Sequence, residues 1–281
     1  MKENIYVIGD IHGRYKALKE VLNKSKFDRK NDTLIVMGDI VDGGYNTSKV
    51  IDELLKIKSL VFIKGNHDNW MINYIFKGHK SNEWINQGGA NTLNSYGGKV
   101  VPGSSINTLP VMVDVNGVKV PRKHIEFLGR GLYYFEFDNM LFVHGGFDPN
   151  KPIETQDPHF LMWDRTLIKY AENNNIEKYD KVFIGHTSTQ MIEREWINYI
   201  CRDCEQEWEK KVKSYRDMRG EPVCPKCNSK DIFQSLGCTK PLKIGNLFCL
   251  DTGGGWNGKL TIMNIKTEEY WQSKLQEEPI K

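Results

Sequence analysis

The sequence predicts an α/β fold in which short buried strands alternate with helices. Six short runs of β-branched or aromatic residues each stop abruptly at a polar residue beside a glycine. Near-continuous apolar runs of this length are typical of strands buried on both faces. Apolar residues at helical spacing separate the first three runs. This alternation of strand, helix and strand favours an α/β architecture with right-handed crossovers.

The six predicted strands are distributed along the whole chain. They run over Ile5 to Asp10, Thr33 to Asp39, Leu60 to Asn66, Met140 to Gly145, Lys181 to His186 and Asn246 to Asp251. The helical spacing is carried by Ala17, Leu18, Val21 and Leu22, and then by Val50, Ile51, Leu54 and Leu55. Each polar terminal residue is therefore expected at the carboxyl end of a strand, where open α/β sheets place their sites.

Two segments depart from this pattern and are interpreted as insertions. Residues 70–131 embed Trp84 and Tyr96 among Asn and Gly, and are expected to form a mainly helical insertion beside the site. Residues 193–239 are dense in Lys, Arg and Glu and carry four paired cysteines. We expect them to form a small subdomain inserted into one domain that spans residues 1–281.

Composition excludes several classes of protein. Of the 281 residues, 39% are hydrophobic and 27% charged, which is ordinary for a globular protein with a sizeable core. The net charge of +3 gives no electrostatic argument for binding nucleic acid or an anionic membrane. The sequence has no run of about eighteen apolar residues, so no membrane span is predicted. The first strand follows the N-terminus without a signal-peptide pattern, so a cytoplasmic location is expected.

Five strand ends carry side chains that bind metal ions. The predicted ligands are Asp10, His12, Asp39, Asn66, His144 and His186. Three imidazoles, two carboxylates and an amide suit borderline or hard divalent ions such as Mn, Fe, Zn or Ni. One such ending alone is typical of a turn or a helix cap. Five of them in order on five apolar strands indicate a metal centre.

This ligand set predicts two metal ions that share Asp39, because each carboxylate oxygen can bind one cation. The other ligands are assigned as Asp10 and His12 on one ion and Asn66, His144 and His186 on the other. Two cations about 3.5 to 4 Å apart can clamp the attacking and leaving oxygens of a displacement at phosphorus. They also lower the pKa of a bound water toward about 7. The sequence therefore predicts a metal-dependent phosphoric ester hydrolase that attacks with a metal-bridging hydroxide.

Three further residues are candidates for catalysis. His67 directly follows ligand Asn66, so its side chain is expected to point away from the metals and to act as the general acid. Asp68, beside it, is expected to orient and charge the imidazole. Arg165 is the candidate substrate-binding clamp, because a guanidinium binds two phosphate oxygens at once. The alternative for Arg165 is a surface ion pair with Asp164. The other histidines, expected on the surface or in packing, are His79, His124 and His159.

Four cysteines in two Cys-x-x-Cys pairs predict a zinc ribbon. Cys201 and Cys204 are separated from Cys224 and Cys227 by nineteen residues, a spacing typical of a four-cysteine zinc site. A rubredoxin-like iron site is the alternative. The predicted zinc would fold a segment too polar to build its own core. Cys249 lies in a predicted strand and is expected to be a small buried hydrophobe.

The ribbon has two possible roles. It is either a structural clip or a docking element for a protein or nucleic-acid partner. Docking is suggested by Lys210, Lys211, Lys213, Arg216 and Arg219. The same stretch carries Glu205, Glu207 and Glu209, and a run of mixed charge is usually solvated surface.

Together these residues resemble the calcineurin-like metallophosphoesterase superfamily, and specifically its bacterial and bacteriophage serine/threonine protein phosphatase (PPP-like) branch. The resemblance covers most of the chain. Beyond the ligands it includes Trp84 with Gly88-Gly89 and Thr92-Leu93, Trp163 with Arg165, and Asp251-Thr252-Gly253 followed by Gly258-Lys259-Leu260. It implies a four-layer α/β/β/α sandwich with the metals, commonly Mn or Fe with Zn, between two sheets. It also implies phosphomonoester hydrolysis by direct attack, without a phosphoenzyme.

The sequence departs from this branch at Gly43. Such phosphatases usually carry an arginine there, after Gly-Asp-x-Val-Asp, as a second phosphate clamp, and the sequence does not place Arg14 or Arg130 as a replacement. The leading hypothesis is a serine/threonine protein phosphatase that also accepts small phosphoesters. The alternative is a nucleotide hydrolase or phosphodiesterase, such as a dinucleoside polyphosphatase. It could use Trp256 as a base-stacking surface, although packing of the closing turn is the preferred interpretation of Trp256. An inactive phosphatase fold that presents the ribbon to a partner is the third hypothesis.

Overall fold

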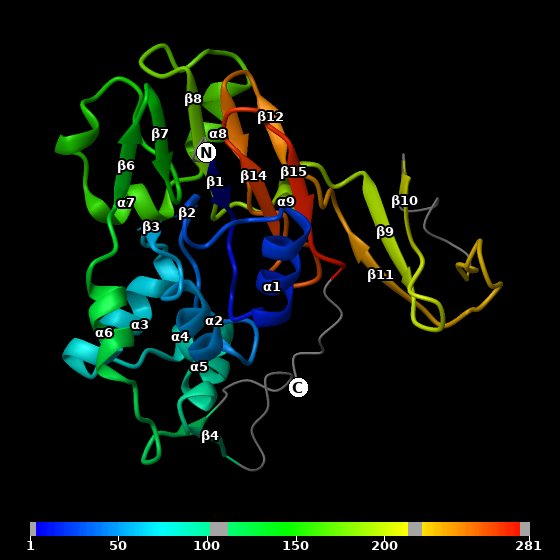
Figure 1. The fold of residues 1–281 in the computed structure, drawn as a ribbon, viewed down its shortest axis with the longest axis horizontal. Helices are drawn as coiled ribbons and strands as arrows, with labels where there is room; N and C mark the ends of the chain where they lie inside the picture. The colour runs from blue at the N-terminus through cyan, green and yellow to red at the C-terminus, as the bar shows by residue number, and fades with distance from the viewer. Residues whose placement is uncertain (1–3, 102–111, 213–220, 276–281) are drawn as a thin grey trace.

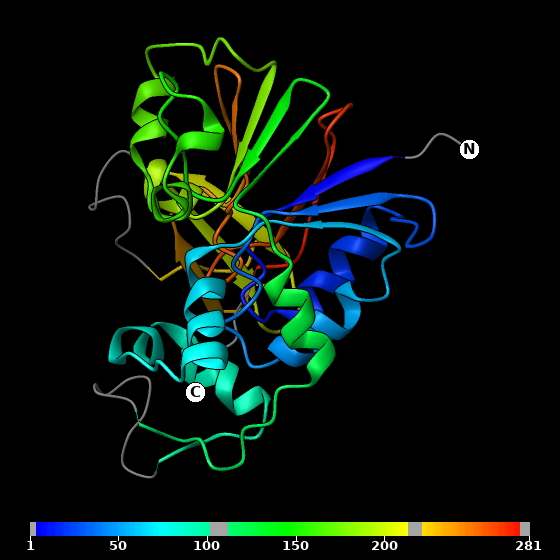
Figure 2. The same ribbon diagram turned by 90° about the vertical axis from the view of Figure 1, so that its left-hand side faces the viewer.

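Two five-stranded sheets face each other at the centre of the molecule, each with helices on its outer side (Figure 2). The computed structural model describes residues 4–101, 112–212 and 221–275. The six strands predicted from the sequence are all present as β1, β2, β3, β7, β8 and β13. The predicted α/β fold with four layers is therefore confirmed.

The first sheet has the strand order β15-β14-β1-β2-β3. Its strands are β1 (Ile5–Ile8), β2 (Thr33–Val36), β3 (Ser59–Phe62), β14 (Thr261–Asn264) and β15 (Tyr270–Gln272). The first three are parallel, whereas β14 and β15 pair antiparallel at one edge. Helices α1 (Tyr15–Lys24), α2 (Thr47–Leu54), α3 (Asn66–Lys77) and α6 (Arg122–Gly129) share one buried apolar cluster with its outer face.

The second sheet has the order β12-β13-β8-β7-β6. Its strands are β6 (Tyr134–Phe137), β7 (Met140–Val143), β8 (Lys181–Ile184), β12 (Leu242–Ile244) and β13 (Leu247–Cys249). The central three are parallel, so their carboxyl ends meet at one edge. The outer face is covered by η2 (Ile153–Thr155), α7 (Pro158–Trp163) and α8 (Thr166–Ala171).

Aromatic side chains fill the space between the two sheets. The Phe183 ring stacks between Phe142 and Phe248, with both centroid distances at 4.9 Å. Val7 and Ile35 meet this stack from the first sheet. Each strand buries alternate residues here and the others against helices, which explains why the sequence reads as continuous apolar runs.

The first insertion is mainly helical, as predicted, and carries one small hairpin. It contains α4 (Asn82–Trp84), the π-helical turn η1 (Ile85–Gly89), α5 (Ala90–Ser95), β4 (Lys99–Val100) and β5 (Val113–Asp114). Trp84 is 1% exposed and packs in the same cluster as α1 and α2. This insertion therefore extends the core of the first sheet.

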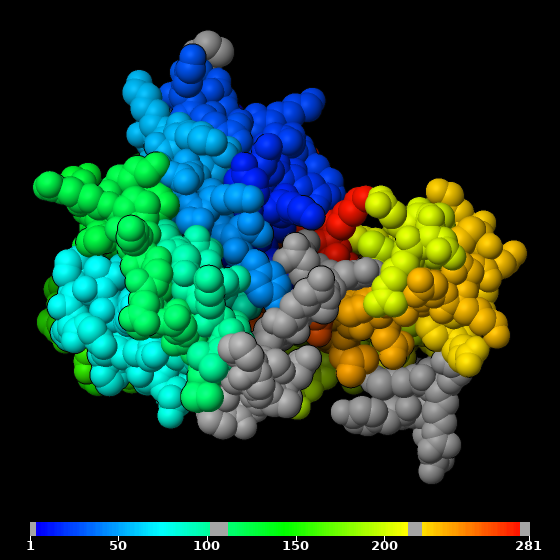
Figure 3. All heavy atoms as spheres, turned by 90° about the horizontal axis from the view of Figure 1, so that it is seen from below, coloured from blue at the N-terminus to red at the C-terminus, as the bar shows by residue number. Residues whose placement is uncertain are grey.

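The cysteine-bearing segment forms a separate antiparallel sheet that projects from the body (Figure 1), and it makes a distinct yellow and orange lobe in Figure 3. Its strands, in the order β10-β9-β11, are β9 (Trp196–Cys201), β10 (Glu207–Lys211) and β11 (Ile232–Leu236). The short helix α9 (Thr189–Ile192) leads into it from β8. No helix in the described ranges is long and apolar enough to cross a membrane.

Candidate active site

The carboxyl ends of the strands bring the six predicted metal ligands together. Asp10 and Asp39 follow β1 and β2, and Asn66 is the first residue of α3, which follows β3. His144 and His186 follow β7 and β8 in the other sheet. Two groups of closely spaced donor atoms result, one of His12, Asp39 and His67 and one of Asp39, His144 and His186. Asp39 belongs to both groups.

One oxygen of Asp39 faces the histidines of both groups. Its Oδ2 lies 3.7 Å from His12 Nε2 and 3.3 Å from His144 Nε2. Its Oδ1 instead accepts a hydrogen bond from the backbone N–H of His67 at 3.0 Å. The second oxygen is thus turned toward the start of α3, and the expectation that each carboxylate oxygen faces a different cation stays a prediction.

Backbone carbonyls fix the orientation of two of the imidazoles. His12 Nδ1 lies 2.9 Å from the Val41 carbonyl, and His144 Nδ1 lies 2.6 Å from the Met37 carbonyl. Because a carbonyl only accepts hydrogen bonds, Nδ1 carries a proton in each ring, and Nε2 is turned toward the site. This arrangement is usual for histidines that bind metal ions.

The pKa values of the three site histidines His12, His144 and His186 are shifted in different directions. Burial lowers the pKa of His12 to about 4 and that of His186 to about 3, so both rings are neutral at physiological pH. Although burial opposes it, the Asp39 carboxylate raises the pKa of His144 to about 10. A proton on His144 thus balances the charge of Asp39, and a cation bound between them would take over that role.

Two buried polar atoms show that the site fits metal ions. Asp10 Oδ1 and His186 Nε2 have no hydrogen-bond partner among the residues that the structure describes. Asp10 is held in place through its other oxygen, which accepts from the His186 backbone N–H at 3.0 Å. Buried polar atoms without partners are costly unless something else binds them. The carboxylate, imidazole and amide donors suit a borderline or hard divalent cation.

His67 is oriented by Asp42 and not, as expected, by Asp68. The expectation that Asp68 helps to charge the imidazole agrees with the effect of its carboxylate, which raises the pKa of His67 against the effect of burial. His67 Nδ1 lies 2.7 Å from Asp42 Oδ2. Asp42 is completely buried and also accepts from Trp84 Nε1 and Thr92 Oγ1. Although burial opposes it, Asp39 and Asp42 raise the pKa of His67 above its ordinary value. His67 also lies beside the metal-type donors and does not point away from them.

Asp68 organises the backbone around the bridging carboxylate. Its two oxygens accept from the N–H groups of Gly65, Asp39 and Ile40 at 2.7 to 3.0 Å. The side chain of Asp68 is therefore directed at two strand ends, and it has no oxygen on the His67 ring. It acts as a cap for α3 that also joins β2 to β3.

Several site residues have left-handed backbone conformations. His12, Asp39, Asp42 and His186 have φ angles of 46°, 48°, 67° and 62°. Non-glycine residues rarely adopt these angles, and they tend to occur at functional sites where the surrounding structure enforces them. These turns bring the side chains together at the carboxyl ends of the strands.

The backbone at Gly43 leaves no room for the arginine found there in similar phosphatases. Its φ is +66°, and an added Cβ would lie 2.9 Å from the Gly255 carbonyl oxygen and 3.1 Å from His12 Cβ. Neither proposed replacement reaches the open site. Arg14 is buried and donates through Nη2 to the Gly255 and Trp256 carbonyls, and Arg130 is exposed beside Phe127.

Arg165 lies at the rim of the site. Its Nη1 donates to the His186 carbonyl at 3.1 Å and to Thr187 Oγ1 at 2.9 Å, and the residue is exposed. Asp164 instead caps α8 by accepting from the Thr166 and Leu167 N–H groups. The guanidinium is therefore positioned next to a predicted ligand with donors facing outward.

Three tryptophans surround the donor cluster, a feature that the sequence did not indicate as a set. Trp70 packs edge-on against His67 at 4.8 Å, and Trp163 packs in the same way against Trp70 at 5.3 Å and His186 at 5.9 Å. On another side, Trp256 lies 5.9 Å from His12 and is 37% exposed. Trp256 thus borders the site and does not only pack the closing turn.

Asp251 is a further acidic group, which the sequence indicated as a strand end and as part of the family resemblance but not as a site residue. Burial, and then the charge of Asp39, raise its pKa to about 6. Burial, and then the charge of Asp251, raise the pKa of Asp10 well above its usual range. The charges of three carboxylates, Asp10, Asp39 and Asp251, therefore act on one another, and bound divalent cations would offset this repulsion.

The four ribbon cysteines form a separate cluster. Cys201 Sγ lies 3.5 Å from Cys227 Sγ, and Cys204 Sγ lies 3.5 Å from Cys224 Sγ. These distances exclude disulfides and approach the edge of about 3.8 Å expected for a tetrahedral zinc–thiolate site. Cys249 is fully buried in β13, as expected.

Of the five basic residues thought to support docking, Lys210 and Lys211 lie on β10. Lys213, Arg216 and Arg219 lie outside the described residues. The acidic residues of the ribbon pair with the body, since Glu205, Glu207 and Glu209 bind Lys274, Lys259 and Lys240. Partner docking through the ribbon stays a prediction.

Comparisons with known proteins agree with this geometry. The family described as calcineurin-like phosphoesterase matches residues 3–213. A symmetrical bis(5'-nucleosyl)-tetraphosphatase of Coxiella burnetii is 38% identical over 69 residues, which span 25% of this chain and only 24% of that relative. A protein of the same name from Neisseria meningitidis is 25% identical over 287 residues, covering 95% of this chain and 94% of that one.

Two solved structures share the fold. A candidate diadenosine tetraphosphatase has a TM-score of 0.54 at 14% identity, with coverage of 98% of this chain and 95% of that chain. A cold-active protein-tyrosine phosphatase of Shewanella has a TM-score of 0.50 at 12% identity, with coverage of 98% and 81%. At such low identity these likenesses describe the architecture alone.

Proposed function

The chain belongs to the calcineurin-like phosphoesterase family and is a metal-dependent phosphoester hydrolase, and on that premise we propose that it cleaves dinucleoside polyphosphates. The single observation that carries the choice of substrate is the set of tryptophans around the donor cluster. Trp163 and Trp256 border it beside different metal-type histidines. Any nucleobase can stack on such a ring, because every base has a flat π-face.

We propose that the metal ions are held by Asp10, His12, Asp39, Asn66, His144 and His186, with Asp39 shared. Asn66 Oδ1 lies 3.2 Å from His144 Nε2, as expected for two ligands of one ion. Bound divalent cations would supply activation of water and neutralisation of phosphate charge. Mn, Fe and Zn all suit these donors.

The remaining steps belong to residues of the chain itself. Arg165 binds phosphate oxygens at the rim with the donors that face outward. His67 delivers a proton from Nε2 to the leaving oxygen, because its Nδ1 is engaged by Asp42. Asp42 keeps the imidazole charged and correctly turned. A water oxygen then forms the new bond to phosphorus as the bond to the leaving oxygen breaks.

Symmetrical cleavage of a dinucleoside tetraphosphate would break the central anhydride bond and release two nucleoside diphosphates. The curated relatives named for this reaction include one that aligns over nearly the whole chain. Gly43 adds a physical reason, because the absence of a side chain there allows the Gly255 carbonyl to approach closely and the loop that carries Trp256 to lie beside His12.

The second candidate function is the serine/threonine protein phosphatase activity expected from the sequence. It is favoured by the buried His67–Asp42 pair, because a general acid matters most when the leaving oxygen is strongly basic, as a serine or threonine oxygen is. The leaving group of a dinucleoside tetraphosphate is far less basic.

An assay of the purified protein with added Mn²⁺ separates the two candidates. Diadenosine tetraphosphate and a phosphoserine peptide are compared by kcat/KM, and the nucleotide products are resolved by chromatography. We expect ADP as the only nucleotide product and a clear preference for the dinucleotide. A preference for the phosphopeptide would replace this proposal with the second candidate, and no hydrolysis of either or of an aryl phosphate would favour a binding module.

A further inference from the structure

The loop that carries Trp256 connects the active site to the cysteine ribbon. We call residues 253–259 the closing loop. Its ends pair as a bridge between Gly253 and Lys259, and the Gly258 N–H donates to the Gly253 carbonyl at 2.8 Å. Four of its seven residues are glycines, so its conformation depends on contacts from outside.

On its inner side the closing loop contacts the catalytic centre. The Trp256 ring lies 5.9 Å from His12, and a Cβ added at Gly255 would lie 2.2 Å from His12 Cδ2. Buried Arg14 holds the Gly255 and Trp256 carbonyls. A shift of the loop would therefore move Trp256 relative to a predicted metal ligand.

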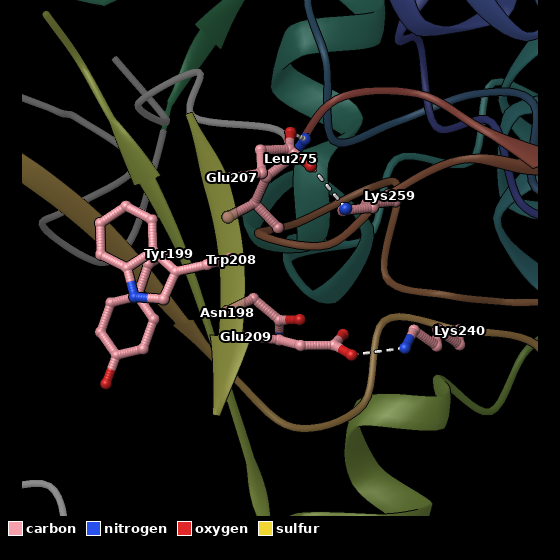
Figure 4. Close-up of a pocket in the computed structure, with 8 residues that line it drawn as sticks. All are labelled: Asn198, Tyr199, Glu207, Trp208, Glu209, Lys240, Lys259 and Leu275. Atoms are coloured by element: carbon pink, nitrogen blue, oxygen red, sulfur yellow. Dashed lines mark hydrogen bonds and ion pairs between the residues drawn. The ribbon is translucent and has the colours of Figure 1, made fainter. Parts of the chain in front are cut away.

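On its outer side the loop is bound to ribbon strand β10. Lys259 Nζ lies 2.6 Å from Glu207 Oε2, and the two side chains are 20% and 26% exposed. The other oxygen of Glu207 accepts from the Leu275 N–H at 2.7 Å, which keeps the carboxylate in place. Figure 4 shows this pair across a cavity between the ribbon and the body.

A second contact comes from strand β11 through α9. Gln190 Nε2 donates to Ser235 Oγ and to the Leu236 carbonyl, both at 2.8 Å. Its Oε1 lies against the start of the closing loop, where a Cβ on Gly253 would approach it to 2.0 Å. Both outer strands of the ribbon are therefore linked to the closing loop. Strand β10 contacts it directly, and strand β11 contacts it through Gln190.

We propose that the ribbon acts within the chain as a positioning element for the active site, with Glu207 and Lys259 as positioning residues that set where Trp256 meets the base of the substrate. The part about the base rests on the proposed function. The metal ligands lie on the strand ends of the two central sheets, so release of the loop should weaken substrate binding and leave the chemical step intact.

The ribbon offers a matched control two residues along the same strand. Glu209 pairs with Lys240 at 2.5 Å, and Figure 4 shows this second pair beside the first. Lys240 lies outside the closing loop. Removing the charge of Glu209 therefore breaks a second ion pair between the ribbon and the body and leaves the contacts of the closing loop in place.

The test compares Glu207→Gln and Lys259→Met with Glu209→Gln in the full-length, metal-loaded protein. We expect KM for diadenosine tetraphosphate to rise about fivefold in the first two, the upper range for loss of one ion pair. Their kcat should stay within about twofold of the wild type, and Glu209→Gln should match the wild type in both. The charge exchange Glu207→Lys with Lys259→Glu should restore KM in part, because a lysine at position 207 cannot accept the hydrogen bond from the Leu275 N–H.

Hydrogen exchange gives a readout that does not depend on the substrate. We expect amides of residues 253–259 to exchange faster in Glu207→Gln and Lys259→Met than in Glu209→Gln. Equal exchange in all three variants would overturn the positioning role, whichever substrate is cleaved. Faster exchange in a protein that does not cleave the dinucleotide would retain the positioning role and reject only the proposed substrate.

Discussion

The catalytic centre and the cysteine ribbon both gather metal-binding side chains, but they are built in opposite ways. The centre takes its donors from five strand ends in two sheets, and all six predicted ligands are 8% exposed or less. The ribbon takes four thiols from two turns of one small sheet, and Cys227 is exposed. Among the described residues of the ribbon, a small apolar cluster around Ile197 and Tyr199 forms the core.

Because of this difference, the two sites depend on metal for different things. The donors of the centre are positioned by the large core between and around the sheets, so the protein scaffold is expected to persist without metal. The ribbon has little core of its own, so zinc binding is expected to supply much of its folding free energy. Loss of metal from the centre should therefore remove activity, whereas loss from the ribbon should loosen structure.

The largest expected effect is that of Asp39→Ala. Removing the shared carboxylate should lower kcat/KM for an aryl phosphate on the order of a thousandfold, equivalent to about 4 kcal/mol of transition-state stabilisation. Steady-state kinetics measure this loss, and circular dichroism should show an unchanged fold. A variant that kept a tenth of the wild-type activity would show that Asp39 is not a shared ligand.

The next effect is that of His67→Asn, which should depend on the leaving group. Turnover of an alkyl phosphate should fall on the order of a hundredfold or more, because its leaving oxygen needs a proton. Hydrolysis of an aryl phosphate with an acidic phenol should fall far less. Asp42→Asn should show the same dependence more weakly, since Asp42 acts through the imidazole. Equal losses on both substrates would assign His67 another role.

Arg165→Ala should produce a smaller change, mainly in binding. Loss of its charged hydrogen bonds should raise KM about tenfold or somewhat more and leave kcat less affected. Arg130→Ala is the matched control, because this exposed arginine lies beside Phe127 and away from the donor cluster. Unchanged kinetics in Arg165→Ala would remove the residue from the site.

The smallest effect on chemistry is expected from Cys204→Ser. Aryl phosphate turnover should stay within about twofold of the wild type, because the cluster lies apart from the donors at the strand ends. Amides of β9 and β11 should nevertheless exchange faster with solvent, because the ribbon has lost a zinc ligand. If aryl phosphate turnover collapsed instead, the two sites would not be independent in the way described.

Much of the donor cluster could be predicted because its determinants are local. An apolar run that ends at Gly9-Asp10 or Gly185-His186 indicates a strand end, and parallel strands in one sheet bring their ends together. The same runs predict the fold, because a strand that is apolar on both faces must be covered on both sides by other sheets or helices. The clustering of the four cysteines could likewise be predicted from their spacing.

The rest depends on contacts between distant segments. Asp42 reaches His67 only because Trp84 and Thr92 of the helical insertion hold it there, and Asp68, adjacent in sequence, is turned toward backbone N–H groups. The mostly apolar strand β9 lies in a segment dense in charged residues, and β10 has a single apolar residue, so the ribbon sheet was not predicted as strands. Trp256 meets His12 through a glycine-rich loop whose path no local pattern specifies.

Metal content measured on the purified protein tests the central claim most directly. Inductively coupled plasma mass spectrometry should find about three metal ions per chain, two at the catalytic centre and one zinc in the ribbon. Cys204→Ser should lower the count to about two and leave aryl phosphate hydrolysis in place. A wild-type protein that binds only about one ion per chain and still hydrolyses the ester would contradict a two-metal centre.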